Sequence, residues 1–172
     1  MTIRFLQEIS LILILFLAAL YDLRFQRVPN RLLAIGVAVL LALRFAEGVL
    51  PLLQSLFWAI LVLLISQPIY RCGMAGAADI KMIVLIVACR PDEKGLFICL
   101  LALLAGGGCA VFRLLRGNLW KKRMRHMLWY VRQLRDGAYP PYYLAERDGR
   151  EAVFPLAGCF LFGAVLGCGL IG

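Results

Sequence analysis

Six runs of apolar residues divide the chain, and polar segments separate them. The runs cover about residues 3–21, 32–46, 49–70, 78–89, 95–115 and 153–171. A helix needs roughly 20 apolar residues, and at least about 17, to cross the hydrocarbon core of a membrane. The first, third, fifth and sixth runs meet this length, the second is marginal and the fourth is short. The fourth run can cross only if it tilts little and its ends are buried in protein.

The distribution of Lys and Arg indicates how many of these runs cross. If all six do, the segments 22–31, 71–81 and 113–151 share one side and hold 15 of the 19 basic residues. The other side holds the remaining four, which are Arg4, Arg44, Arg90 and Lys94. Because cytoplasmic loops are enriched in Lys and Arg, this division predicts six transmembrane helices with both termini outside.

The longest polar segment, about residues 116–151, is an insertion in what we predict to be a single membrane domain covering residues 1–172. It contains the stretch NLWKKRMRHMLWYVRQL. The apolar residues of this stretch recur at helical spacing, and they are Trp120, Met124, Met127, Leu128, Val131 and Leu134. This pattern predicts a basic amphipathic helix on the anionic cytoplasmic leaflet. The alternative is a soluble helix packed against the rest of the protein.

Composition supports an all-α polytopic membrane protein and narrows its chemistry. Hydrophobic residues make up 63% of the chain, whereas roughly half of a soluble domain is apolar. The net charge of +9 follows from the cytoplasmic loops, so we expect no nucleic-acid partner. The six cysteines form no Cys-x-x-Cys pair, and the single histidine, His126, is far from them in sequence. We therefore predict no disulfide framework, no bound metal and no cofactor.

Two acidic residues lie at the predicted cytoplasmic edge of the membrane. Asp22 follows the first apolar run, and Asp79 lies at the start of the fourth, each near a Lys or Arg. Ionisable groups at membrane depth indicate a functional site, although an aspartate at a helix end is also common as a cap or as a partner of arginine. Two neighbouring carboxylates do not both ionise easily, so one retains a proton near neutral pH. Such a pair can activate water and polarise a peptide carbonyl, as in aspartic proteases.

Two motifs around these aspartates resemble those of the type IV prepilin peptidases. Asp22 followed by LRFQRVPN is similar to the hairpin of that family, in which an aspartate precedes Ile/Val-Pro-Asn. The stretch GAADIK, residues 76–81, is similar to the G-x-G-D-x-K signature of the GxGD aspartic membrane proteases. The C-terminal FPLAGCFLFGAVLG is similar to the Pro-led, Gly-rich last helix of the family.

The resemblance implies an aspartic endopeptidase of the bacterial inner membrane, with Asp22 and Asp79 as catalytic residues. Its substrate would be the leader of a prepilin or pseudopilin, cleaved at the cytoplasmic membrane edge, and membrane lipid and pilus-assembly proteins would be its other partners. The expected site-shaping or substrate-binding residues are Gly76, Ala78, Lys81, Pro29 and Asn30.

The chain departs from the family pattern in two ways. Ala78 replaces the glycine that precedes the second aspartate. The zinc-binding domain of the longer family members is absent between the first two runs, so neither zinc nor N-methyltransferase activity is expected. The short, peptidase-only form resembles those of tight-adherence (Flp) pilus systems.

Three other interpretations stay open. A presenilin-like or signal-peptide-peptidase-like protease shares the YD pair and a G-x-x-D element. A carboxylate-based ion carrier would use the same two aspartates, but its acids are expected at mid-membrane among broken helices. An inactive scaffold would be consistent with Ala78. The short size and the Val-Pro-Asn hairpin favour the prepilin branch.

Overall fold

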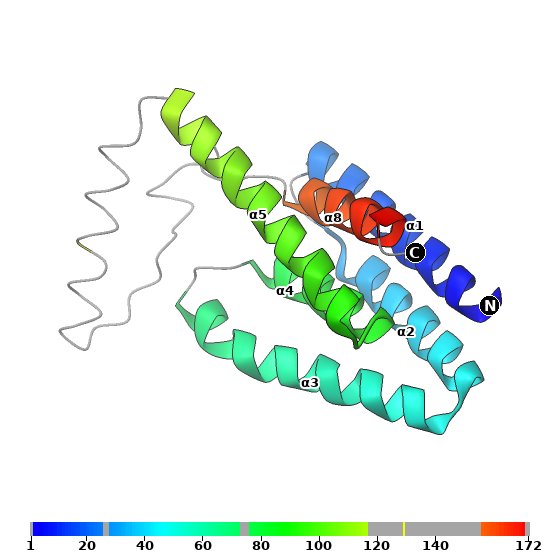
Figure 1. Cartoon of the computed structure of the whole chain (residues 1–172). Helices are drawn as coiled ribbons and strands as arrows, with labels where there is room; N and C mark the ends of the chain where they lie inside the picture. The colour runs from blue at the N-terminus through cyan, green and yellow to red at the C-terminus, as the bar shows by residue number, and fades with distance from the viewer. Residues whose placement is uncertain (1, 26–27, 73–75, 117–128, 130–155, 171–172) are drawn as a thin grey trace.

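The computed structural model is built from helices, and it describes residues 2–25, 28–72, 76–116, 129 and 156–170. The helices are α1 (Thr2–Phe25), α2 (Asn30–Glu47), α3 (Val49–Arg71), α4 (Ala77–Cys89), α5 (Glu93–Arg116) and α8 (Ala157–Leu170). Figure 1 shows them as a bundle in which α3 lies on the side away from α1 and α8. The all-α prediction therefore holds for the described residues.

The boundaries of α2 follow from its flanking residues. Pro29 precedes the first turn with φ −66° and ψ 129°, an extended conformation that proline favours. The Pro29 carbonyl accepts a hydrogen bond from the Leu32 amide at 3.1 Å, which starts the helix. Gly48 ends α2 with φ +133°, a conformation that side-chain-bearing residues rarely adopt. α3 begins at the next residue, so a single glycine joins the two helices.

α4 is short because both of its ends are fixed by local chemistry. Gly76 precedes it in an extended conformation, and Asp79 caps the first turn. At the other end Arg90 leaves the helical region, with φ −132° and ψ 83°, because Pro91 follows it. The 13 residues between these ends give a helix about 20 Å long, which is less than the roughly 30 Å of a hydrocarbon core.

The other helices surround α4. It contacts each of the other described helices, and eight of its residues are buried: Ile80, Met82, Val84, Leu85, Ile86, Val87, Ala88 and Cys89. The core of the molecule forms where α4 meets Leu11 and Leu15 of α1, Leu40 of α2 and Phe160 of α8. The C-terminal part of α4 is therefore buried in protein, whereas Gly76 and Ala77 at its start are exposed.

Two glycines allow close contacts between helices. A Cβ added at Gly36 of α2 would lie 2.9 Å from Ile14 of α1 and 3.0 Å from Leu85 of α4. A Cβ added at Gly163 of α8 would lie 2.8 Å from the Ile98 carbonyl oxygen and 2.9 Å from the Ala102 nitrogen, both on the α5 backbone. Small residues at such positions are typical of helix packing in membranes.

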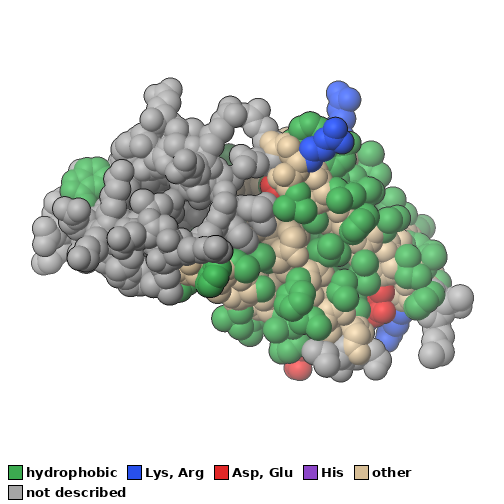
Figure 2. All heavy atoms as spheres, turned by 90° about the horizontal axis from the view of Figure 1, so that it is seen from above, with side chains coloured by type: hydrophobic (Ala, Val, Ile, Leu, Met, Phe, Trp, Pro, Cys, Tyr) green, Lys and Arg blue, Asp and Glu red, His purple; other side chains and the backbone are tan. Residues whose placement is uncertain are grey.

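The outer surface of the bundle is largely apolar. Figure 2 shows hydrophobic side chains over much of the described part of the visible face, and Leu50 and Leu64 of α3 are 78% and 64% exposed. Among the described residues, three stretches are long and apolar enough to cross a membrane: Ile3–Phe25, Val49–Arg71 and Glu93–Phe112. The chain is therefore a membrane protein, as predicted.

The six-crossing count stays a prediction. α2, expected to be marginal, is an 18-residue helix. The sixth run was expected to be long enough, but its described helix, α8, has only 14 residues. The predicted basic amphipathic helix lies outside the described residues, apart from Trp129.

Candidate active site

Asp22 lies in the last turn of α1, where its carboxylate meets the start of α8. Its Oδ2 atom accepts a hydrogen bond from the backbone N–H of Ala157 at 3.1 Å. Ala157 is the first residue of α8, so its N–H has no acceptor within that helix and is available to the carboxylate. The side chain of Asp22 is half-buried. The C-terminal helix therefore holds one of the two predicted catalytic carboxylates.

Asp79 lies in the first turn of α4 and binds the backbone just before it. Its Oδ2 atom accepts a hydrogen bond from the Gly76 N–H at 3.2 Å, while its own N–H donates to the Gly76 carbonyl at 3.2 Å. The first bond is the side-chain half of a capping box, and the second is a backbone bond of the first turn. A Cβ at Gly76 would lie only 3.0 Å from Asp79 Oδ2. Since Gly76 has φ −73°, glycine is needed there for space beside the carboxylate rather than for its backbone freedom.

The two carboxylates interact electrostatically. Burial raises the pKa of Asp79, the hydrogen bond from Gly76 opposes that rise, and the negative charge of Asp22 adds to it. Asp79 precedes the uninterrupted apolar stretch of α4, which begins after Lys81. We therefore expect Asp79 to be the carboxyl that holds the shared proton.

Lys81 and Asn30 form the other polar contact of the site. The Lys81 ammonium donates a hydrogen bond to Asn30 Oδ1 at 2.7 Å. This contact joins the N-terminal part of α4 to Asn30, the first residue of α2, directly after Pro29. Among the described residues, no ion pair joins Lys81 to Asp79. The hydrogen bond to Asn30, rather than an ion pair with Asp79, therefore accounts for the position of Lys81.

The structure brings the predicted site residues to one end of the bundle. Asp22 and Asp79 interact there, Gly76 binds Asp79, and Asn30 and Pro29 lie at the start of α2 beside Lys81. Ala78 is half-buried within the first helical turn, where alanine is favoured over glycine. The Asp79 cap forms with Ala78 in place, so this departure is compatible with the hydrogen bond between Gly76 and the carboxylate.

One site contact was not predicted from the sequence. The Pro-led last helix was recognised as a family feature, but nothing in its spacing indicated that the Ala157 N–H would reach Asp22. The signal that could have been used is the new helix start after Pro155, since a helix N-terminus attracts a carboxylate.

The described residues offer no cluster of three or more His, Cys, Asp or Glu side chains that could hold a metal ion. The six cysteines, at 72, 89, 99, 109, 159 and 168, are free thiols. The expectation that the chain uses no zinc stays a prediction.

Comparison with known proteins agrees with the motifs. The sequence model of the type IV leader peptidase family matches residues 9–111. This match covers more than half of the chain and includes Asp22, Pro29, Asn30 and the segment from Gly76 to Lys81. It confirms the family resemblance inferred from the sequence. Searches of the curated proteins and of the solved structures gave no match.

Proposed function

Since the chain belongs to the type IV leader peptidase family, which makes it a protease, we propose that it cleaves the leader peptide of a prepilin-like precursor. Asp22 and Asp79 are the proposed catalytic pair, and cleavage takes place at the cytoplasmic edge of the bacterial inner membrane. The observation that carries this proposal is that Asp22, at the end of α1, and Asp79, at the start of the contacting helix α4, lie near enough for the charge of Asp22 to raise the pKa of Asp79. Both lie within the segment that the family match covers.

The proposed reaction divides the work between a neutral and a charged carboxyl. Asp79, protonated because of its burial and the nearby charge, donates its proton toward the carbonyl oxygen of the scissile peptide. Asp22 takes a proton from the attacking water, whose oxygen forms the new bond to the carbonyl carbon. When the tetrahedral intermediate collapses, the C–N bond breaks and the leaving nitrogen receives the proton held by Asp22. One hydroxyl proton of the new carboxyl group returns to Asp79, so both aspartates regain their starting states.

The hydrogen bonds of the site support this division because they leave each carboxylate room to react. Within the described residues, only the Oδ2 atom of each aspartate receives a hydrogen bond, from Ala157 in one case and from Gly76 in the other. Backbone donors at helix starts fix the carboxylates without neutralising them through an ion pair. The exposed small residues Gly76 and Ala77 border the site on the side where a peptide backbone would approach.

The distribution of Lys and Arg supports a cytoplasmic position of the site. The described ends of the helices nearest the site carry Arg24, Arg31, Arg71 and Lys81, and the opposite ends carry Arg4, Arg44, Arg90 and Lys94. With the ten basic residues of segment 113–151, the site lies on the side that the positive-inside rule assigns to the cytoplasm. There the aspartates would attract the basic leader of a prepilin, whereas the basic segment 113–151 would repel it.

Co-expression with a candidate prepilin, followed by gel mobility of the precursor, tests the proposal. Asp22→Asn and Asp79→Asn should each abolish processing, a loss of at least about a thousandfold, because neither remaining carboxyl can complete the proton transfers alone. Both variants should accumulate in the membrane like the parent. Full processing by either variant would contradict the two-aspartate mechanism, and loss of membrane protein would require the activity to be normalised to folded enzyme.

A further inference from the structure

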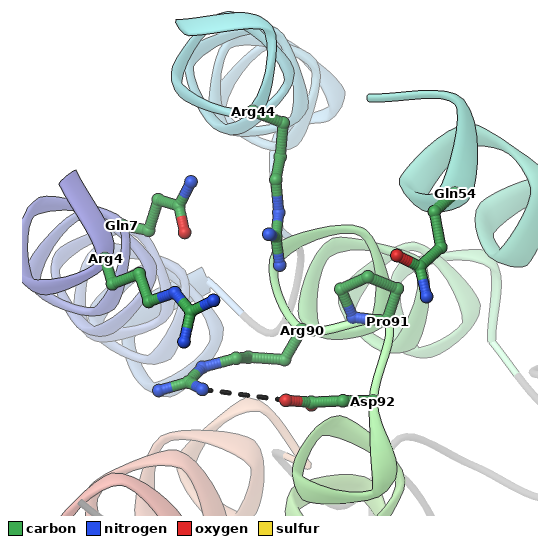
Figure 3. Close-up of a pocket in the computed structure, with 7 residues that line it drawn as sticks. All are labelled: Arg4, Gln7, Arg44, Gln54, Arg90, Pro91 and Asp92. Atoms are coloured by element: carbon green, nitrogen blue, oxygen red, sulfur yellow. Dashed lines mark ion pairs between the residues drawn. The ribbon is translucent and has the colours of Figure 1, made fainter. Parts of the chain in front are cut away.

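A second polar site lies at the end of the bundle opposite the aspartates. It is a pocket of about 110 Å³ lined by Arg4, Gln7, Arg44, Gln54, Arg90, Pro91 and Asp92. Figure 3 shows the guanidinium groups of Arg4 and Arg44 and the amide of Gln54 directed toward the space between the helices. Along α1, the 15 residues from Gln7 to Asp22 span about 22 Å at 1.5 Å per residue. The pocket is therefore separate from the candidate active site.

The pocket collects basic residues on the side where they are scarce. Of the four basic residues outside the 15 assigned to the cytoplasm, three line it: Arg4, Arg44 and Arg90. They come from three segments, the start of α1, the end of α2 and the residue after α4. Asp92 is the one acidic residue among the described residues that line the pocket, but Glu47 and Glu8 pair with Arg44 and Arg90 from beside it.

The ion pairs of the described residues engage two of the three arginines. Arg44 pairs with Glu47 at 2.8 Å and also donates to the Cys89 carbonyl at the end of α4. Arg90 pairs with Glu8 and, at 3.7 Å, with Asp92. No ion pair or hydrogen bond is formed by the side chain of Arg4 within the described part of the chain. Replacing Arg4 would therefore break no ion pair or hydrogen bond among the described residues.

Two buried donors of the pocket lack acceptors. The Gln7 side chain is only 3% exposed, and its Nε2 atom has no hydrogen-bond partner among the described residues. The Nε atom of Arg44 is also buried and has no hydrogen-bond partner among the described residues. Buried polar groups without partners are costly, so they mark places where an acceptor is missing.

We propose that this pocket binds a phosphate group, with Arg4, Arg44 and Gln7 as its donors. Guanidinium groups favour phosphate because their fixed N–H donors match several oxygens at once. The volume of about 110 Å³ is several times the roughly 15 Å³ that one water requires. Two sources supply this chemistry at a membrane edge: the headgroup of an anionic phospholipid, and free phosphate.

Thermal unfolding of the purified, delipidated protein in detergent tests the proposal and separates the two sources. One arm adds phosphatidylglycerol in mixed micelles and compares it with phosphatidylcholine. The other adds inorganic phosphate and compares it with chloride at equal ionic strength. A ligand of the folded state raises the unfolding temperature. Stabilisation by phosphatidylglycerol alone identifies a lipid site, and stabilisation by inorganic phosphate identifies a site for the free anion.

Matched variants assign any effect to the pocket. Arg4→Gln should weaken binding by at least about tenfold, because it removes a charge-assisted hydrogen bond. Gln54→Glu, at an exposed position on the rim of the pocket, should do the same by adding a negative charge. Arg71→Gln, at an exposed arginine on the opposite side, should bind like the parent. The proposal is wrong if neither ligand stabilises the protein beyond its control, or if both pocket variants still respond fully.

This proposal does not rest on the proposed protease function. None of the altered residues touches the aspartates, so cleavage of a prepilin by the pocket variants is a separate measurement. If the protein binds phosphate but cleaves no prepilin, the phosphate proposal stands and the protease proposal is wrong. If it cleaves the prepilin but binds no phosphate, the protease proposal stands and the phosphate proposal is wrong.

Discussion

Asp79 acts as a helix cap and is also the proposed acid of the reaction. An aspartate at a helix end is often only a cap, and Asp79 does bind the Gly76 N–H in that way. A cap alone does not require a second carboxylate nearby, yet the charge of Asp22 acts on this group. Neither aspartate forms an ion pair with an arginine in the described residues. The local sequence pattern predicted Asp22 and Asp79 as site residues. That the two lie near each other could be seen only in the folded structure.

Gly76→Ala tests whether the space beside Asp79 matters. Alanine adopts φ −73° without strain, but its Cβ would lie 3.0 Å from Asp79 Oδ2. The carboxylate must then shift by a few tenths of an ångström, and we expect prepilin processing to fall by about tenfold while the protein stays folded.

Gly107→Ala is the matched control for that experiment. A Cβ at Gly107 meets no atom within 4 Å, and alanine favours the helix, so processing should be unchanged. Equal activity of the two alanine variants would show that the contact between residue 76 and the carboxylate is unimportant.

Asp79→Asn provides a pH-dependent test of the buried carboxyl. Because the pKa of Asp79 is raised in the folded protein, the folded state binds its proton more tightly than the unfolded state. The parent therefore loses stability as pH rises from about 4, the ordinary value of an aspartate, through the raised pKa. Asparagine mimics the protonated form and can still accept the Gly76 hydrogen bond. The variant should unfold at a higher temperature than the parent at pH 7, and the difference should shrink toward pH 4.

Thermal unfolding in detergent between pH 4 and pH 8 measures this difference. Glu93→Gln, at an exposed carboxyl, controls for the removal of one negative charge. A variant less stable than the parent at pH 7, with no dependence on pH, would contradict the assignment of the proton to Asp79.

At the scale of the helices, local chemistry fixed the boundaries that the sequence predicted well. Pro29, Gly48 and Pro91 end or start helices through backbone conformation, which depends on a few adjacent residues. Whether α4 lies at membrane depth depends instead on its burial by the helices around it. The length of the fourth apolar run alone therefore could not decide this. The contact of Ala157 with Asp22 and the arginine pocket could not be predicted, because each joins segments far apart in sequence.

Gly163→Ala tests the role of α8 in holding Asp22. The new Cβ would lie 2.8 Å from the Ile98 carbonyl oxygen and 2.9 Å from the Ala102 nitrogen, and backbone atoms of α5 cannot move aside easily. We expect a loss of about 1–3 kcal/mol of stability from overpacking. Because α8 begins at Ala157, its displacement should also weaken the hydrogen bond to Asp22 and reduce processing.

Gly169→Ala, in the same helix, is the control, since nothing lies within 4 Å of a Cβ there. Thermal unfolding and gel mobility of the co-expressed prepilin measure the two effects. A Gly163→Ala protein as stable and active as the Gly169→Ala protein would show that the α5–α8 contact does not position the carboxylate.

At the scale of the whole molecule, the two polar sites lie at opposite ends of the same three helical segments. α1, α2 and α4 each carry a residue of the candidate active site near one end and a residue of the arginine pocket near the other. The sequence predicted this polarity through the 15-to-4 division of basic residues. It could not predict that three of the four scarce basic residues converge, because convergence depends on how the helix ends pack.

Single-cysteine labelling of intact cells tests this polarity, on which the proposed protease depends. In a background with all six cysteines replaced, cysteines at Leu50 and Glu93, both exposed at helix starts, should react with an impermeant reagent. Cysteines at Phe25 and Arg71, exposed at the opposite helix ends, should react only after the membrane is opened. The reason is that α1 and α3 run outside to inside in the predicted topology, so both end in the cytoplasm near the two aspartates. If the positions at 25 and 71 were accessible from opposite sides, the chain could not bring Asp22 and Asp79 to one membrane face. The two-carboxylate mechanism would then be wrong together with the topology.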